Sequence, residues 1–125
     1  QFMQVLGDME NANHDDLKKE IERGAFVRAV FLAESLGLPK EETRNLQARA
    51  LCQMAVEYRN ALGTQKLARQ YGFSRADLKE TLNQYVEKLR HEGKVRMLEP
   101  SYDHHTRKYL TFEEWMALFF KKPDL

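Results

Sequence analysis

The order of apolar and polar positions along the chain predicts a mainly helical protein that ends in a short β-hairpin and one more helix. Five runs have apolar residues at the spacing of a helix, and glycine or proline separates most of them. The runs cover about residues 14–24, 26–36, 39–60, 64–71 and 74–91. The first thirteen residues have no such pattern, so we expect a flexible lead-in there.

After Gly93 the apolar period changes from that of a helix to that of a strand. The stretches "KVRML" at 94–98 and "TRKYLTF" at 106–112 alternate polar and apolar residues, which predicts two strands. Between them "EPSYDHH" is rich in turn formers. Thr111 is followed three residues later by Glu114, and this spacing predicts a capping box at the start of the last helix.

A tight turn is expected between the runs 64–71 and 74–91. Gly72 can adopt the positive φ that ends a helix abruptly, and the Ser74 hydroxyl can cap the helix that follows. Leu78 anchors the second helix from inside and leaves its opposite face exposed. Two helices joined in this way and followed by a hairpin make a winged helix-turn-helix.

The stretch "LARQYGFSRADLKETLNQYVEKLRHEGKVRML" resembles the DNA-binding core of bacterial winged-helix transcription regulators, particularly the MarR-like group. The shared pattern is Leu-Ala, then Gly, an apolar residue, Ser-Arg, and a leucine-spaced helix that ends in Glu-Gly. The stretch "DHHTRKYLT" resembles the returning strand of the wing. The resemblance covers about residues 64–115 and implies a DNA-binding protein that regulates transcription.

The predicted fold is therefore mainly α with a small β-hairpin wing, a winged helix-turn-helix preceded by an N-terminal helical extension. Residues 14–60 supply support or dimerisation helices, with the first helix of the winged-helix core at about 40–60, and residues 61–122 supply the helix-turn-helix, wing and C-terminal helix. Two dense apolar stripes, at 26–31 and 115–120, favour a homodimer, because regulators of this fold usually pair two reading heads.

Charge along the chain gives the helix-turn-helix segment a positive excess. Residues 64–111 contain ten Lys or Arg and six Asp or Glu, a net charge of +4, whereas the whole chain has a formal net charge of +1. A phosphate-binding surface needs such an excess.

Cys52 is the single cysteine, which excludes an internal disulfide and fits a reducing cytoplasm. No apolar stretch is long enough to cross a bilayer, so we expect no membrane association.

The helix at 74–91 is expected to lie in the major groove of double-stranded DNA. Arg75, Lys79 and Asn83 share one face of it and can reach base edges. Other positions near helix starts and in the wing suit phosphate or minor-groove contacts. The predicted DNA-binding residues are Thr64, Gln65, Ser74, Arg75, Ala76, Lys79, Asn83, His104, His105, Arg107 and Lys108.

Alternatives to DNA binding stay open at this point. Asp77 and Glu80 would repel phosphate, so the helix face can also be read as a plain solvated surface, and the fold as a protein-interaction module in a larger assembly. We expect no metal, because the adjacent His104 and His105 point opposite ways on a strand. Cys52 is expected in the core. The sequence has no nucleotide-binding glycine loop and no recognisable catalytic triad, so we expect neither an enzyme nor a cofactor.

Overall fold

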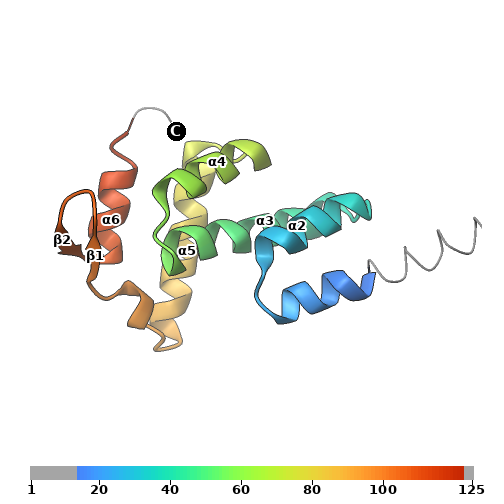
Figure 1. The fold of residues 1–125 in the computed structure, drawn as a ribbon, viewed down its shortest axis with the longest axis horizontal. Coiled ribbons are helices and arrows are strands. Elements are labelled where there is room, and N and C mark those ends of the chain that lie inside the picture. The colour runs from blue at the N-terminus through green and yellow to red at the C-terminus, as the bar shows by residue number, and fades with distance from the viewer. Residues whose placement is uncertain (1–13, 123–125) are drawn as a thin grey trace, which may run out of the picture. The chain divides into compact units, whose positions relative to one another are not determined.

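The computed structural model describes residues 14–122, and its backbone forms two compact units. The division falls after Ala50, inside helix α3 (Lys40–Cys52), whereas the sequence analysis placed it after residue 60. We call the part before this point unit 1 and the part after it unit 2. The chain is mainly helical with a two-stranded hairpin after α5, which confirms the predicted fold class (Figure 1). The predicted lead-in, residues 1–13, lies outside the described residues.

Unit 1 contains a helical segment at 14–22, helix α2 (Phe26–Ser35) and most of α3. Its core is made of small and aliphatic side chains, namely Leu17, Ala29, Val30, Ala33, Leu46 and Ala50. The apolar stripe predicted at 26–31 does not all face this core, because Phe31 is 71% exposed. Among residues 14–122, no helix combines the length and the apolar character needed to cross a bilayer.

Unit 2 begins with the end of α3, which widens into a π-helix, Gln53–Glu57. Helix α4 (Ala61–Tyr71) follows after a short loop and starts earlier than predicted, because the Asn60 side chain caps it by accepting the backbone N–H of Gly63. Helix α5 (Arg75–His91) buries one side. Most of its helical core comes from the aliphatic residues Leu51, Ala55, Val56, Ala68, Leu78, Leu82, Val86 and Leu89.

The junction between α4 and α5 matches the sequence analysis. Gly72 has φ of +73° and ends α4 in the left-handed conformation. The N–H of Phe73 then donates to the carbonyl of Ala68 at 2.9 Å, closing the turn. Ser74 caps α5, because its Oγ accepts the N–H of Asp77 at 3.0 Å. Both predicted end signals are thus confirmed.

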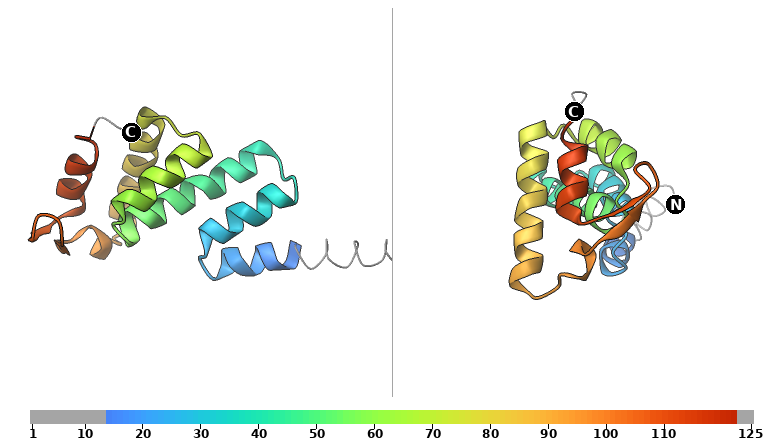
Figure 2. Two further views of the ribbon diagram at one scale, coloured as in Figure 1. Left: turned by 45° about the horizontal axis from the view of Figure 1, so that its top comes forward. Right: turned by 90° about the vertical axis from the view of Figure 1, so that its left-hand side faces the viewer.

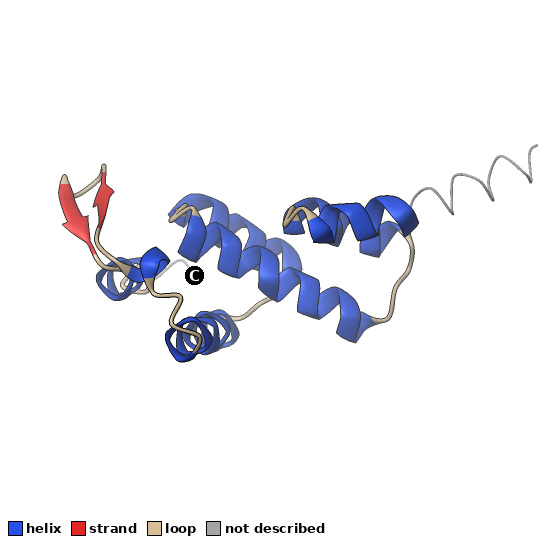
Figure 3. Ribbon diagram, turned by 90° about the horizontal axis from the view of Figure 1, so that it is seen from below, coloured by secondary structure: helices blue, strands red, loops and turns tan. Residues whose placement is uncertain are grey.

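The hairpin consists of β1 (Ser101–Asp103) and β2 (Lys108–Leu110), paired antiparallel with Tyr102 opposite Tyr109. The strand predicted at 94–98 is wrong: a 3-10 helix, Arg96–Leu98, lies there, and β1 lies in the stretch predicted as the turn. The alternation in "KVRML" does not mark a half-buried strand. The stretch has two aliphatic residues, and only one of them, Leu98, is buried. Figure 3 shows the hairpin projecting away from α6.

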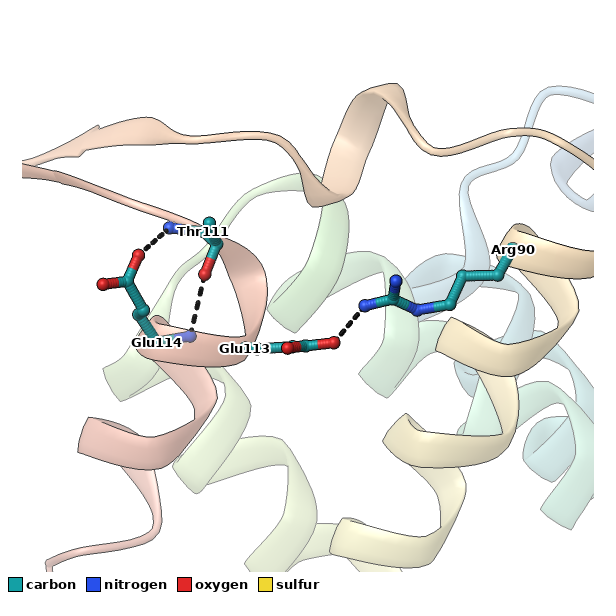
Figure 4. Close-up of polar contacts among 4 residues, drawn as sticks. All are labelled: Arg90, Thr111, Glu113 and Glu114. Carbon is teal, nitrogen blue, oxygen red and sulfur yellow. Dashed lines mark hydrogen bonds and ion pairs between the residues drawn. The ribbon is translucent and has the colours of Figure 1, made fainter.

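Helix α6 (Phe112–Phe119) begins with the predicted capping box. Thr111 Oγ1 accepts the N–H of Glu114 at 3.1 Å, and Glu114 Oε1 accepts the N–H of Thr111 at 2.8 Å (Figure 4). The helix lies beside α5 and runs antiparallel to it (Figure 2, right). Arg90 near the end of α5 pairs with Glu113 at the start of α6, and Arg75 at the start of α5 reaches the chain just after α6.

Candidate nucleic-acid interface

The outward face of α5 forms a shallow groove that contains three of the predicted DNA-binding residues. The groove has a volume of about 620 Å³. Its lining consists of Ala76, Lys79, Glu80, Asn83, Gln84 and Glu87. The structure therefore brings Ala76, Lys79 and Asn83 together on one exposed face, whereas Arg75, which the helical spacing placed with Lys79 and Asn83, does not line the groove.

Two predicted base-reading residues on this face also contact the chain after α6. Arg75 Nη1 donates a hydrogen bond of 2.8 Å to the carbonyl of Lys122. The guanidinium of Arg75 and the ammonium of Lys79 lie 5.7 and 5.9 Å from the centre of the Phe120 ring. Cation–π contacts at exposed sites contribute about 0.5–1 kcal/mol each, so these contacts restrain the two side chains only weakly.

Carboxylates share the outward face of α5 with these cations. Glu80 and Glu87 line the groove beside Lys79, which gives its lining a formal charge of −1. Glu80 Oε1 accepts a hydrogen bond of 3.2 Å from Gln84 Nε2, which keeps that carboxylate on the surface of the groove. The positive excess of the segment therefore does not lie in this groove, and any strong phosphate contact has to come from elsewhere.

The residues predicted to reach phosphates from helix starts divide into three cases. Thr64 is fully buried, and its hydroxyl donates to the carbonyl of Asn60 at 2.7 Å, so its prediction as a DNA contact is wrong. Ser74 is exposed, although its hydroxyl oxygen caps α5. Gln65 is half-buried on α4.

The four wing-tip residues predicted to contact DNA, His104, His105, Arg107 and Lys108, are all exposed. Asp103 holds the tip in place. Its Oδ2 accepts 2.8 Å hydrogen bonds from both the N–H and the hydroxyl of Thr106, and its carbonyl accepts the N–H of Arg107 at 2.7 Å. The hydrogen bonds from Thr106 lower the pKa of the Asp103 carboxyl below its usual range. Arg107 has φ of +58°, a left-handed conformation that is strained for any residue with a Cβ.

Arg59 fixes the base of the wing, a role that the sequence analysis missed. Its guanidinium donates to the carbonyl of Leu110 at 2.7 Å, Met97 at 3.1 Å and Glu99 at 2.8 Å. It also lies 5.6 Å from the centre of the Phe112 ring. Burial lowers the pKa of Arg59, although an arginine in a protein stays charged. The only local signal would have been a charged residue directly before a helix cap, and that signal does not identify partners far along the chain.

A pocket of about 450 Å³, which we call the wing pocket, lies between residues 57–62 and the first half of the hairpin. It is lined by Glu57, Tyr58, Arg59, Asn60, Ala61, Leu62, Ser101, Tyr102, Asp103, His104, His105 and Trp115. Tyr58 and Leu62 are each 60% exposed, and Tyr102 is 44% exposed. No pattern in the sequence predicts this pocket, because its walls come from segments about forty residues apart.

The remaining reactive groups contribute little to a site. Within residues 14–122, no group of three or more His, Cys, Asp or Glu side chains is placed to hold a metal ion. Cys52 is buried in unit 2, as predicted, with Sγ 3.9 Å from the carbonyl oxygen of Thr81. Burial raises the pKa of its thiol to about 12, so the thiol is protonated at neutral pH.

Comparisons of the chain with protein-family models, curated proteins and solved structures found no match.

Proposed function

We propose that the chain binds double-stranded DNA, as a bacterial transcription regulator does, with α5 facing the major groove and the wing facing the backbone. The observation that supports this best is the succession of parts in unit 2. A helix-turn-helix with a left-handed glycine and a capped second helix is followed by an exposed hairpin whose tip bears Arg107 and Lys108. The resemblance of residues 64–115 to winged-helix regulators points the same way.

The geometry changes the weight of the predicted contacts. The wing tip supplies the phosphate-binding charge, because Arg107 and Lys108 are exposed, whereas the groove of α5 has a formal charge of −1. Asn83 supplies an amide that can read a base edge from this groove. Arg75 can also contact DNA if a phosphate or base replaces the carbonyl of Lys122 as the acceptor of its hydrogen bond. Thr64 is no longer in the proposed set.

The test is a titration of a random-sequence duplex at several salt concentrations. Binding through several phosphates weakens steeply as salt rises, by about 0.9 logarithmic units per tenfold change in salt for each phosphate neutralised. Lys108→Ala should weaken binding to all duplexes and reduce this slope by about one unit. Lys18→Ala is the matched control, since it removes an exposed lysine from unit 1, and it should leave the slope unchanged. Duplex binding that does not depend on salt would contradict the proposal.

The charge on α5 favours a second candidate, a winged-helix module that binds protein. Asp77, Glu80 and Glu87 are all exposed on α5, and each repels phosphate. A protein partner would accept this mixture of charges more readily than a duplex would. Absence of duplex binding at low salt, with the fold intact, would favour this candidate.

A homodimer is part of the proposal. On α2, Val27 and Phe31 are both exposed, at 39% and 71%, and they lie one turn apart. Such an apolar pair on a surface helix suits a symmetric contact with a second copy. Sedimentation at micromolar concentration should show a dimer that Phe31→Asp dissociates, and a monomer for the unaltered chain would contradict the proposed assembly.

A further inference from the structure

We propose that the wing pocket binds an unpaired nucleotide, so that the preferred target is DNA with a single-stranded stretch next to a duplex. This inference builds on the proposed DNA binding but uses a different surface. None of the residues that line the pocket lies on α5.

The size of the pocket fits a small planar group. Pockets for small molecules commonly range from about 300 to 1,000 Å³, and this one measures about 450 Å³. Its walls come from the end of the π-helix, the first turn of α4, and β1 with the wing turn. A group held there would contact the wing and α4 together.

Aromatic surface for stacking comes from two tyrosines. Tyr58 is 60% exposed, and Tyr102 meets the Tyr109 ring edge to face at a centroid distance of 5.4 Å. Trp115 is different, because it stacks on both Phe112 and Phe119 and has only 6% of its surface exposed. The base would therefore stack on the tyrosines, while Trp115 closes the floor of the pocket.

The distribution of charge favours a base in the pocket and phosphates outside it. The acidic residues Glu57 and Asp103 line the pocket. The one arginine that lines it, Arg59, already donates to three carbonyls. A phosphate inside would be repelled. Lys108 on β2 stands opposite Asp103 on β1 in the strand register. A cation that suits the phosphate therefore lies on the hairpin that forms one wall of the pocket.

Exposed aromatic rings beside basic residues are how proteins bind unpaired strands without a strict sequence requirement. Stacking a base on an aromatic side chain is favourable for every base, because each has a π-face. A blunt duplex keeps its bases paired and cannot place one in the pocket. The preference should therefore depend on the presence of unpaired bases and only weakly on their identity.

The experiment compares three DNA probes: a blunt duplex, the same duplex with a single-stranded overhang at either end, and the single strand alone. Affinity is measured by anisotropy of labelled DNA. Emission of Trp115, the one tryptophan of the chain, reports directly on the pocket. We expect the overhang duplex to bind about tenfold more tightly than the blunt duplex, in line with stacking of a single base. It should also change Trp115 emission, whereas the blunt duplex should not.

Three variants make the test specific. Tyr58→Ala should abolish the preference for the overhang and leave affinity for the blunt duplex unchanged, whereas Tyr58→Phe should keep the preference because the ring remains. Val95→Ala, which shortens an exposed apolar side chain of unit 2 outside the pocket, should have no effect on the preference. Each altered side chain is exposed in the structure, so each variant should stay folded.

The possible outcomes separate this inference from the proposed function. Equal affinity for blunt and overhang duplexes, with Tyr58→Ala without effect, would overturn the pocket and leave duplex binding standing. Binding of the single strand alone, lost in Tyr58→Ala, would support the pocket and overturn duplex binding. No binding of any probe would overturn both.

Discussion

The α4–α5 junction and the wing are neighbouring parts of unit 2, yet different forces hold them. The junction depends on residues next to one another: Gly72 supplies the left-handed turn, and the Ser74 hydroxyl caps the helix two residues later. The wing depends on Arg59, whose guanidinium reaches the carbonyl of Leu110, 51 residues along the chain. Each part of the proposed interface therefore fails in its own way when it is altered.

The difference teaches that one side chain positions the wing, whereas the junction is determined locally. Arg59 bonds both to Met97 and Glu99, before β1, and to Leu110, at the end of β2. It therefore joins the two ends of the hairpin. A hairpin of two short strands is at best marginally stable alone, so this external support matters more than the ladder itself.

The largest effect is expected from Arg59→Ala. It leaves three carbonyls without their charged donor and should lower the free energy of unfolding by about 2–3 kcal/mol, since hydrogen bonds to charged groups are the stronger ones. Urea denaturation measures the loss. Arg59→Gly is the matched control, because Arg59 has φ of +51° and glycine adopts this conformation without strain, so it should be more stable than Arg59→Ala by about 1 kcal/mol. Equal stability of Arg59→Ala and the unaltered chain would contradict the role of Arg59 as the support of the wing.

The junction should respond more moderately. Gly72→Val should lower the free energy of unfolding by about 1–3 kcal/mol, because a β-branched residue strongly resists the left-handed conformation. A Cβ at Gly72 would have nothing within 4 Å, so the cost is one of backbone strain alone. Gly37→Val, at φ of +69° with the same open space, should cost a similar amount when melting temperatures are compared. A Gly72→Val variant that melts like the parent would show that the turn tolerates the change.

The wing tip offers a smaller change in the opposite direction. Arg107 has φ of +58°, so Arg107→Gly should relieve strain and raise the free energy of unfolding by about 0.5–1 kcal/mol. The same change removes a cation, so duplex binding should weaken while stability rises. Urea denaturation and a duplex titration on one preparation test both effects. A loss of stability together with a loss of binding would mean that the Arg107 side chain supports the turn.

The smallest effect is expected from acid. Hydrogen bonds from Thr106 lower the pKa of Asp103 in the folded chain, so the charged carboxylate stabilises the wing turn above its unfolded pKa of about 3.9. This contribution is lost as the pH falls through the lowered pKa. Asp103→Asn should therefore reduce the pH dependence of amide protection at Thr106, measured by NMR hydrogen exchange between about pH 2 and 5. An unchanged pH dependence would assign it to another group.

The sequence predicted those parts of the fold that depend on neighbouring residues. Gly72, Ser74 and the pair of Thr111 and Glu114 each determine a helix end through contacts within a few residues, and all were confirmed. The first strand was misplaced, because three-residue strands offer too little alternation to distinguish from a turn.

The candidate site was predicted in part for the same reason. The wing-tip cations are exposed as expected, whereas Thr64 is buried, because Asn60 caps α4 earlier than predicted and turns Thr64 inward. The contacts of Arg59 and the walls of the wing pocket join segments that only the folded chain brings together. No local pattern marks such pairs.

Because the single cysteine is buried, its reactivity can report how often the surrounding core opens. The Cys52 thiol is buried in unit 2 and has a pKa raised to about 12, so a neutral alkylating reagent can react with it only when this part of the chain opens. The rate of alkylation under native conditions then measures how often the core around Cys52 opens to solvent. If the chain binds DNA as proposed, DNA should slow this alkylation by the factor by which binding suppresses the opening, and the protein needs no label.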